Sequence, residues 1–377
     1  MAISAAGIIF SSLNKNTLSR LTADRTVAAI PFACRYRLVD FCLSNMVNAN
    51  ISNIFIVANY NYRSLLEHIG SGKDWDLARR DGGITVISPF QTSYATSYPQ
   101  MFSTHMEALR NMKEYISELK EDYVVLMDSD TVLNFDLANV IKTHETTGAE
   151  VTFVTKTVSK GYTSKNPKMM FTTVAGKITN ISIGASYNEK SPELSLGVYV
   201  MKTELLRTII EEADAHALDS LTKFFLTMYK SKNYRVYKHD GYVASVSSFL
   251  DYYKHSISLA TNPEARDSLL WKKEFPIFTR VHNSAPTVHA ETAVVENSVI
   301  ADECVIEGTV INSVIFRGVH IGRGTVIKNS VLFHGTFVED NVELNCIVTD
   351  KDVHVTGGVK LSGNENMPFY VQKGRKI

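Results

Sequence analysis

The sequence has no excess charge of either sign, only four cysteines and no long apolar run, and each absence excludes a class of protein. Its 39 basic residues offset 39 acidic ones, so no positive field is available to hold a phosphate backbone or an anionic membrane. We therefore expect neither nucleic acid nor a membrane as a partner. Cys34, Cys42, Cys304 and Cys346 show no CxxC spacing, which indicates reduced packing thiols in a reducing compartment.

Residues 1–10 are mostly apolar, but they lack a basic leading region and a cleavage site, and they are too few to cross a bilayer. They predict a buried first strand, and we expect a cytoplasmic protein. The chain has 377 residues, of which 45% are hydrophobic and 21% charged. Single cores stop growing near about 250 to 300 residues, so we expect more than one domain.

The N-terminal part alternates buried strands with amphipathic helices. A helix is predicted over 104–119, where Thr104 and Glu107 can form a capping box. This alternation predicts an α/β, Rossmann-like domain with a mostly parallel sheet over residues 1–262. The strands are expected in apolar, β-branched runs at 6–10, 54–58, 123–127, 151–154 and 197–201.

The C-terminal part has a different period. After a linker at 263–285, apolar residues recur about every six positions, which predicts a parallel β-helix over 286–377. An antiparallel sandwich would need alternation of period two and fits less well. One set of six-residue spacings comprises Val314, His320, Val326, Leu332, Val338 and Leu344, and a second comprises Ile315, Ile321 and Ile327.

Three segments of the N-terminal part carry a resemblance to a known family. Residues 30–45, IPFACRYRLVDFCLSN, closely resemble the stretch after the nucleotide loop of bacterial glucose-1-phosphate adenylyltransferases. Residues 68–77 and 82–90, which contain HIGSG, WDL and GGITVISPF, continue the resemblance. It implies a nucleotidyltransferase domain followed by a left-handed β-helix, assembly as a tetramer, and magnesium-dependent condensation of ATP with glucose 1-phosphate to ADP-glucose and pyrophosphate.

The nucleotide loop departs from the family pattern. In the family this loop is rich in glycine and contains an arginine, so that backbone N–H groups approach the triphosphate closely. The matching residues 10–18 contain no glycine, and Thr17 stands at the arginine position. The polar and positive remnant around this loop, which solvent exposure alone also explains, is Ser11, Ser12, Lys15 and Arg20.

Further charged positions of the family site are altered. The family's phosphate-binding lysine falls within 26–28, Thr-Val-Ala, and its sugar-phosphate Glu-Lys-Pro aligns near 183–185, Ile-Gly-Ala. Of the two magnesium aspartates, Asp130 matches the first, and Ser245 stands in place of the second. Asp130 is therefore a weak candidate metal ligand, and capping of the next turn explains it equally well. Loss of these contacts predicts an inactive site, because each stabilises the transition state.

These departures resemble the regulatory members of the family, commonly called the GlgD type. The resemblance implies a non-catalytic subunit that pairs with a catalytic paralogue in a tetramer. One alternative is an active sugar-phosphate nucleotidyltransferase with a replacement carboxylate beside Asp130. Another is a β-helix acyltransferase with His320 or His334 as general base.

Arg35 is the candidate effector-binding residue. It matches a family lysine that contacts phosphorylated effectors, and a guanidinium can hold a phosphate through two hydrogen bonds. The resemblance thus leaves room for a sugar-phosphate effector. A surface arginine in an ordinary ion pair is the alternative.

Overall fold

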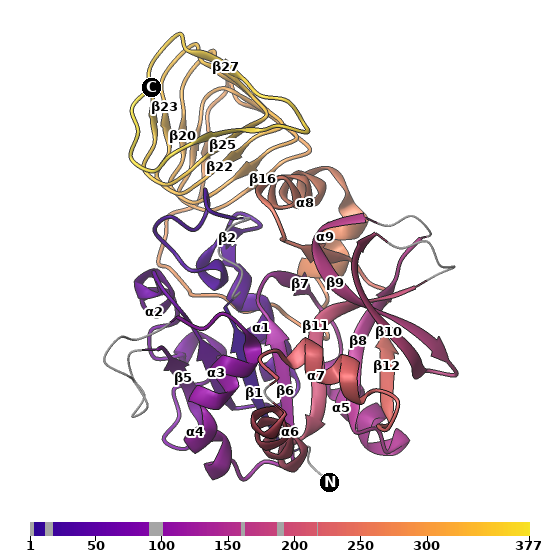
Figure 1. Ribbon diagram of the computed structural model, residues 1–377. Helices are drawn as coiled ribbons and strands as arrows, with labels where there is room; N and C mark the ends of the chain where they lie inside the picture. Colours follow the sequence, from indigo (N-terminus) through magenta and orange to yellow (C-terminus); the bar gives the residue numbers. More distant parts are fainter. Residues whose placement is uncertain (1–3, 12–17, 90–100, 160–162, 187–191, 217) are drawn as a thin grey trace.

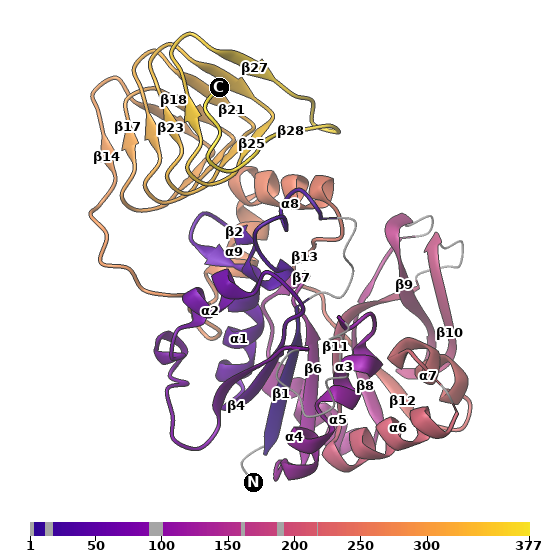
Figure 2. The same cartoon turned by 60° about the vertical axis from the view of Figure 1, so that its left-hand side comes forward.

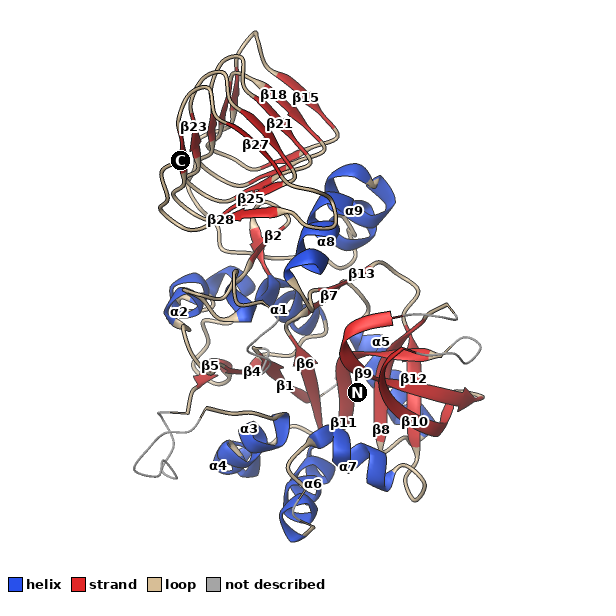
Figure 3. Ribbon diagram, turned by 45° about the horizontal axis from the view of Figure 1, so that its top comes forward, coloured by secondary structure: helices blue, strands red, loops and turns tan. Residues whose placement is uncertain are grey.

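The computed structural model describes residues 4–11, 18–89, 101–159, 163–186, 192–216 and 218–377. An N-terminal α/β domain carries a C-terminal coil of short strands, with α8 (Phe249–Thr261) lying between the two (Figure 1). Figure 3, which is coloured by secondary structure, shows helices around the sheet of the N-terminal domain and loops joining the short strands of the coil.

The central sheet is mixed. In the described residues, the first four strands of its order are parallel, as the sequence predicts, and β12 is parallel to β8, while β11 is antiparallel to both β6 and β8. The expectation of a mostly parallel sheet therefore holds only for the N-terminal half. The strand order is β5 (Gly83–Ile87), β4 (Asn53–Val57), β1 (Ala5–Phe10), β6 (Tyr123–Asp128), β11 (Glu193–Lys202), β8 (Val151–Thr157), β12 (Tyr234–Lys238), β10 (Lys177–Ser186), β9 (Thr163–Val174).

The antiparallel half arises from a hairpin. β9 and β10 are joined by Ala175 and Gly176, which both have positive φ (48° and 77°), the backbone of a tight two-residue turn. This hairpin forms a long arm, which also pairs with β11 and β12. Two short pairs lie apart from the central sheet, β2 (Pro31–Phe32) with β3 (Tyr36–Arg37) and β7 (Thr131–Leu133) with β13 (Val243–Ser245).

Helices cover both faces of the sheet, because its strands are apolar on both sides. One face packs on α1 (Leu38–Asn48), α2 (Arg63–Ile69) and α5 (Leu137–Thr147). The other packs on α3 (His105–Asn111), α4 (Lys113–Glu118), α6 (Thr203–Ala215) and α7 (Leu221–Met228). Two short 3₁₀ helices are η1 (Val27–Ala29) and η2 (Lys73–Trp75).

The helix predicted over 104–119 is two helices that meet at Met112. Its N-terminal cap forms only in part as expected. The Thr104 hydroxyl accepts the Glu107 N–H at 3.1 Å, but the Glu107 carboxylate accepts the N–H of Ser103 instead of that of Thr104.

The C-terminal domain is a parallel β-helix of three sheets (Figure 2). Residues 218–377 are described without a gap, and each sheet there has five parallel strands. The first is β14 (Val288–His289), β17 (Val305–Ile306), β20 (His320–Ile321), β23 (Phe337–Val338), β26 (His354–Val355). The second is β15 (Val294–Glu296), β18 (Thr309–Ile311), β21 (Val326–Lys328), β24 (Glu343–Asn345), β27 (Lys360–Ser362). The third is β16 (Val299–Ile300), β19 (Val314–Ile315), β22 (Val331–Leu332), β25 (Ile347–Thr349), β28 (Phe369–Val371).

The interior stripe of the β-helix shifts by one residue between coils. Successive strands are offset by 17 residues in its middle, so the six-residue period is interrupted once per coil by a spacing of five. The interior therefore runs through Ile315, Ile321, Ile327, Leu332, Val338 and Leu344. Six-residue spacing alone therefore does not identify the interior residues, since His320 and Val326 of the first set are only partly buried.

A third apolar core joins the two domains. Residues of α8 and α9 (Pro263–Leu270) pack with outward-facing residues of the third β-helix sheet, such as Val331 and Phe333. The Tyr253 hydroxyl also donates to the Asn329 carbonyl at 2.7 Å. The segment 263–285, interpreted as a linker, thus begins with a helix that takes part in this core. All four cysteines are buried free thiols, as expected.

In the part of the chain described by the structure, no helix combines the length and apolar character that a membrane span requires.

Candidate functional site

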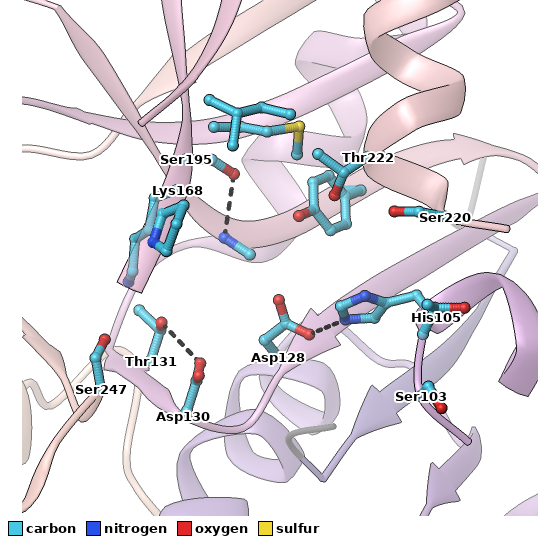
Figure 4. A pocket seen from close by; sticks show the side chains of 16 residues that line it. Ser103, His105, Asp128, Asp130, Thr131, Lys168, Ser195, Ser220, Thr222 and Ser247 are labelled. Atoms are coloured by element: carbon cyan, nitrogen blue, oxygen red, sulfur yellow. Dashed lines mark hydrogen bonds and ion pairs between the residues drawn. The ribbon is translucent and has the colours of Figure 1, made fainter. Parts of the chain in front are cut away.

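A polar cavity of about 260 Å³ opens where β6 ends. In the sheet, β4 lies on one side of β1 and β6 on the other, so the strand order reverses between β1 and β6. Open α/β sheets bind ligands at such a point. Figure 4 shows Lys168, Thr131, Asp130 and Ser247 on one side of the cavity, His105, Ser103, Ser220 and Thr222 on the other, and Asp128 between them. The lining is completed by Thr104, Pro167, Met169, Ile183, Ser195, Gly197 and Tyr199.

Asp128 and His105 form a pair across the cavity floor. Asp128 is the last residue of β6, and its Oδ1 lies 2.6 Å from Nε2 of His105, the first residue of α3. The edge of the His105 ring meets Phe10 of β1 at a centroid distance of 4.6 Å. Burial lowers the pKa of His105, but the charges of Asp128 and Asp130 and the hydrogen bond to Asp128 together outweigh this effect, so the net pKa is raised.

Gly197 makes room for Asp128. Its φ is +71°, and a Cβ at this position would lie 2.5 Å from Oδ2 of Asp128. Only glycine meets both conditions without strain. Gly197 on β11 therefore shapes the cavity through its missing side chain.

Asp130 lies two residues beyond Asp128 and is partly buried. Burial and the neighbouring Asp128 charge raise its pKa, whereas Lys168 acts in the opposite direction. Its Oδ1 accepts a hydrogen bond from the Thr131 hydroxyl at 3.2 Å, and its carbonyl accepts the N–H of Val246 at 2.7 Å.

Ser245 stands beside Asp130, opposite Thr131 in the pairing of β13 with β7. The position matched to a second metal aspartate is thus next to Asp130 in space, but it carries a hydroxyl. The Lys168 ammonium donates a hydrogen bond to this hydroxyl, and the Ser247 hydroxyl lies 3.4 Å from it.

These residues do not fit the magnesium ion that the family resemblance implies. Mg²⁺ binds through carboxylates, water and phosphate oxygens. Here Asp128 is engaged by His105, and an ammonium faces Ser245 and attracts Asp130. Within the described ranges, no group of three or more His, Cys, Asp or Glu side chains is placed to hold a metal.

Among the residues of the nucleotide-loop remnant, the structure describes Ser11 and Arg20, and neither lines this cavity. Ser12 and Lys15 lie outside the described residues. Ser11 is fully buried at the end of β1, where its hydroxyl bonds to that of Thr26 and accepts the N–H of Ala28. Arg20 is exposed over the Phe249 ring, 5.3 Å from its centroid.

Val27 and Arg35 differ sharply in exposure. Val27, at the position of the phosphate-binding lysine, is buried in the core between the domains. Arg35 is exposed and lies over the ring of its neighbour Tyr36, 5.8 Å from the centroid.

The two histidines considered as a general base lie in the β-helix. His320 stacks on Phe337 on the outside of the β-helix, and Nδ1 of His334 bonds to the Arg317 carbonyl.

A second, basic cavity lies between the domains and has a volume of about 330 Å³. Arg25 in its wall is buried and pairs with Asp350 of the β-helix at 2.6 Å, while its Nη1 has no hydrogen-bond partner among the described residues. Burial, with Arg37 and Arg25 nearby, lowers the pKa of Lys351 to about 8. The lining is Asp24, Arg25, Arg63, Ser64, Glu67, Lys351 and Lys373.

Sequence reasoning missed His105, Asp128 and Lys168. A usable signal existed for Asp128, because it directly follows an apolar strand, where ligand-facing residues of parallel sheets lie. His105 and Lys168 carried no such signal, since their roles depend on contacts with residues 23 and 77 positions away.

Comparisons with known families agree with this arrangement. The nucleotidyl transferase family matches residues 14–256, and the GlmU-like C-terminal hexapeptide family matches residues 283–367. The molecule is therefore a nucleotidyltransferase domain joined to a left-handed hexapeptide β-helix.

Relatives that match most of the chain identify the family within this class. The chain is 31% identical over 375 residues to the glycogen biosynthesis protein GlgD of Bacillus subtilis, covering 98% of this chain and 95% of the relative. It is 32% identical to GlgD of Geobacillus stearothermophilus, covering 98% and 96%. It is 29% identical to glucose-1-phosphate adenylyltransferase of Thermosipho africanus, covering 82% and 74%. The chain belongs to the GlgD branch of the glucose-1-phosphate adenylyltransferase family.

Proposed function

We propose that this chain acts in glycogen biosynthesis as a regulatory, catalytically inactive subunit of glucose-1-phosphate adenylyltransferase. The observation that carries the proposal is the surroundings of Asp130. Its neighbour Ser245 offers no carboxylate and is bonded by Lys168, and the expected phosphate-binding cation is replaced by the buried Val27. Nucleotidyl transfer depends on positioned cations and metal-bound carboxylates, so this site lacks the groups the reaction needs.

The first test measures ADP-glucose synthesis from ATP and glucose 1-phosphate with Mg²⁺. The purified chain should give no more than a trace rate. In a complex with a catalytic paralogue, Asp130→Asn on this chain should change the rate only slightly, whereas the same change at the paralogue's own metal aspartate should abolish it. Turnover of the isolated chain at the paralogue's rate would refute the proposal.

The second test concerns assembly. We expect a heterotetramer in which the β-helix supplies much of the contact, because its first coil has unpaired strand edges and exposes Val288 and Val294 at 59% and 47%. Regulation requires that this chain bind the active form of its partner more tightly than the inactive form. Co-expression with a tag on this chain should recover the paralogue, and the complex should exceed the paralogue alone in rate. Failure to co-purify would contradict the assignment.

The third test concerns a phosphorylated effector. The basic cavity offers a second anion site besides Arg35, with Arg25, Lys351 and Lys373 facing one space. Arg35→Ala and Lys351→Met, compared in the same complex, should reveal which residue the effector response requires. An unchanged response in both would remove the effector from the proposal.

One observation favours an active enzyme as the second candidate. Asp128 is a carboxylate close enough to Asp130 to raise its pKa, so it is a candidate replacement for the missing aspartate. If it does, Asp128→Asn should abolish ADP-glucose synthesis, or synthesis of another nucleotide sugar, by the isolated chain.

A further inference from the structure

We propose that Lys168 is a built-in cation that occupies the electrostatic position of a divalent metal at Asp130, so that this site excludes Mg²⁺ and Mn²⁺. The inference rests on this chain's own contacts and not on the proposed regulatory role.

The placement of Lys168 carries the first step. It projects from β9, the outer arm of the sheet, toward a site built by β6, β7 and β13. Its ammonium donates to Ser245, which is the cross-strand neighbour of Thr131 and hence stands beside Asp130. A lysine is a compact point charge on a flexible stem, so it can reach a carboxylate from a distant strand.

The charges around the two carboxylates carry the second step. Asp128 is paired with His105 of α3 at 2.6 Å, and the Lys168 ammonium of β9 is bonded to Ser245, the cross-strand neighbour of the residue after Asp130. A divalent ion at Asp130 would meet a like charge, and it would find a serine where a second carboxylate ligand is needed.

The third step is that two substitutions should restore metal binding at this site. Lys168→Met removes the charge and retains most of the stem, and Ser245→Asp supplies a carboxylate next to Asp130. Together they rebuild an oxygen-rich site from residues already in register. Lys177→Met is the matched control, because this lysine lies exposed on the same arm, at the start of β10.

The experiment measures Mn²⁺ binding by the full-length chain, with electron paramagnetic resonance of free Mn²⁺ and with thermal unfolding in the absence and presence of the same excess of Mn²⁺ for every variant. In the wild type and in Lys177→Met, no Mn²⁺ binding should depend on Asp130, so adding Asp130→Asn should leave the measured binding unchanged. Lys168→Met should gain weak binding, and Lys168→Met with Ser245→Asp should bind one Mn²⁺ at least tenfold more tightly than Lys168→Met alone and unfold at a higher temperature with Mn²⁺ present. Asp130→Asn added to this pair should abolish the gain.

Two results would overturn the proposal. One is Mn²⁺ binding to the wild type that Asp130→Asn removes. The other is a folded Lys168→Met chain, with or without Ser245→Asp, whose Mn²⁺ affinity equals that of the wild type. Because the readout is metal binding, neither result bears on whether the chain regulates a partner, and the activity tests remain independent.

Discussion

At the scale of single residues, Gly197 decides where Asp128 can lie. Gly197→Ala should destabilise the fold by more than the about 1 to 2 kcal/mol that a side chain in the left-handed region costs, because the added methyl would also overlap Asp128. The added methyl would also displace Asp128 from His105. Urea unfolding checks the stability, and the imidazole NMR signals of His105 check the displacement. Gly148→Ala is the control, since that glycine has a similar φ of +59° but open space around its Cβ position. Equal losses in both variants would mean that contact with Asp128 is unimportant.

We predict that Lys351 makes the affinity of the basic cavity for an anion depend on pH. Its folded pKa of about 8 lies below the ordinary 10.5, because burial and nearby arginines disfavour the charged form. The folded state therefore gains stability as pH rises from about 8 toward 10.5, where an unfolded lysine still binds its proton. A bound anion favours the protonated lysine, so anion affinity should fall over the same rise.

Sulfate is a suitable probe because it does not titrate in this range. Its affinity, measured by calorimetry from pH 7 to 9, should decrease through pH 8 in the wild type and in Lys177→Met. In Lys351→Met it should be weaker at pH 7 and nearly independent of pH. A flat profile in the wild type would contradict the role given to Lys351.

At the scale of elements, the β-helix depends on which residues of each short strand face inward. Ile321 and Val326 both belong to six-residue spacings, but Ile321 is fully buried in the interior and Val326 faces outward. Ile321→Ala should cost about 2 to 5 kcal/mol through the cavity it leaves. Val326→Thr should change stability by about 0.5 kcal/mol or less, as outward substitutions usually do. Denaturant unfolding distinguishes them, and a reversed order would show that the interior stripe is misassigned.

The β9–β10 arm shows how an element far along the chain completes a site. Its turn residues, Ala175 and Gly176, together with a register shift between Ile178 and Asn180, set the pairing that brings Lys168 opposite Gly184. The arm therefore supplies one wall of the cavity, while the ends of the central strands supply the floor.

At the scale of the whole molecule, the ion pair of Arg25 with Asp350 joins the two domains. The side chains are 3% and 4% exposed, the atoms lie 2.6 Å apart, and the Tyr370 hydroxyl also donates to Asp350. Arg25→Met should cost about 3 to 5 kcal/mol, because it leaves a buried carboxylate without its partner. Arg25→Met with Asp350→Leu should recover much of this loss. Urea unfolding of the two variants checks it, and equal losses would show that the pair does not couple the domains.

The sequence by itself determined the elements whose signal is local. The five predicted strands lie within β1, β4, β6, β8 and β11 or extend one residue past them, since apolar β-branched runs specify buried strands. The β-helix followed from its period, and Asp130 and Ser245 were picked out by alignment to known motifs. The sequence did not predict the one-residue shift of the interior stripe, because one spacing in each coil is five residues and a constant period of six passes over it.

Only the tertiary structure decided what surrounds Asp130. Asp128 is bonded by His105 of α3, and Ser245 is bonded by Lys168 of β9. Both contacts depend on how the sheet twists and on how the arm folds back. The antiparallel entry of β11 between β6 and β8 likewise follows from the hairpin that precedes it. Charge contacts between distant segments have no periodic signature in a single sequence, because they are fixed by packing and not by local backbone preference.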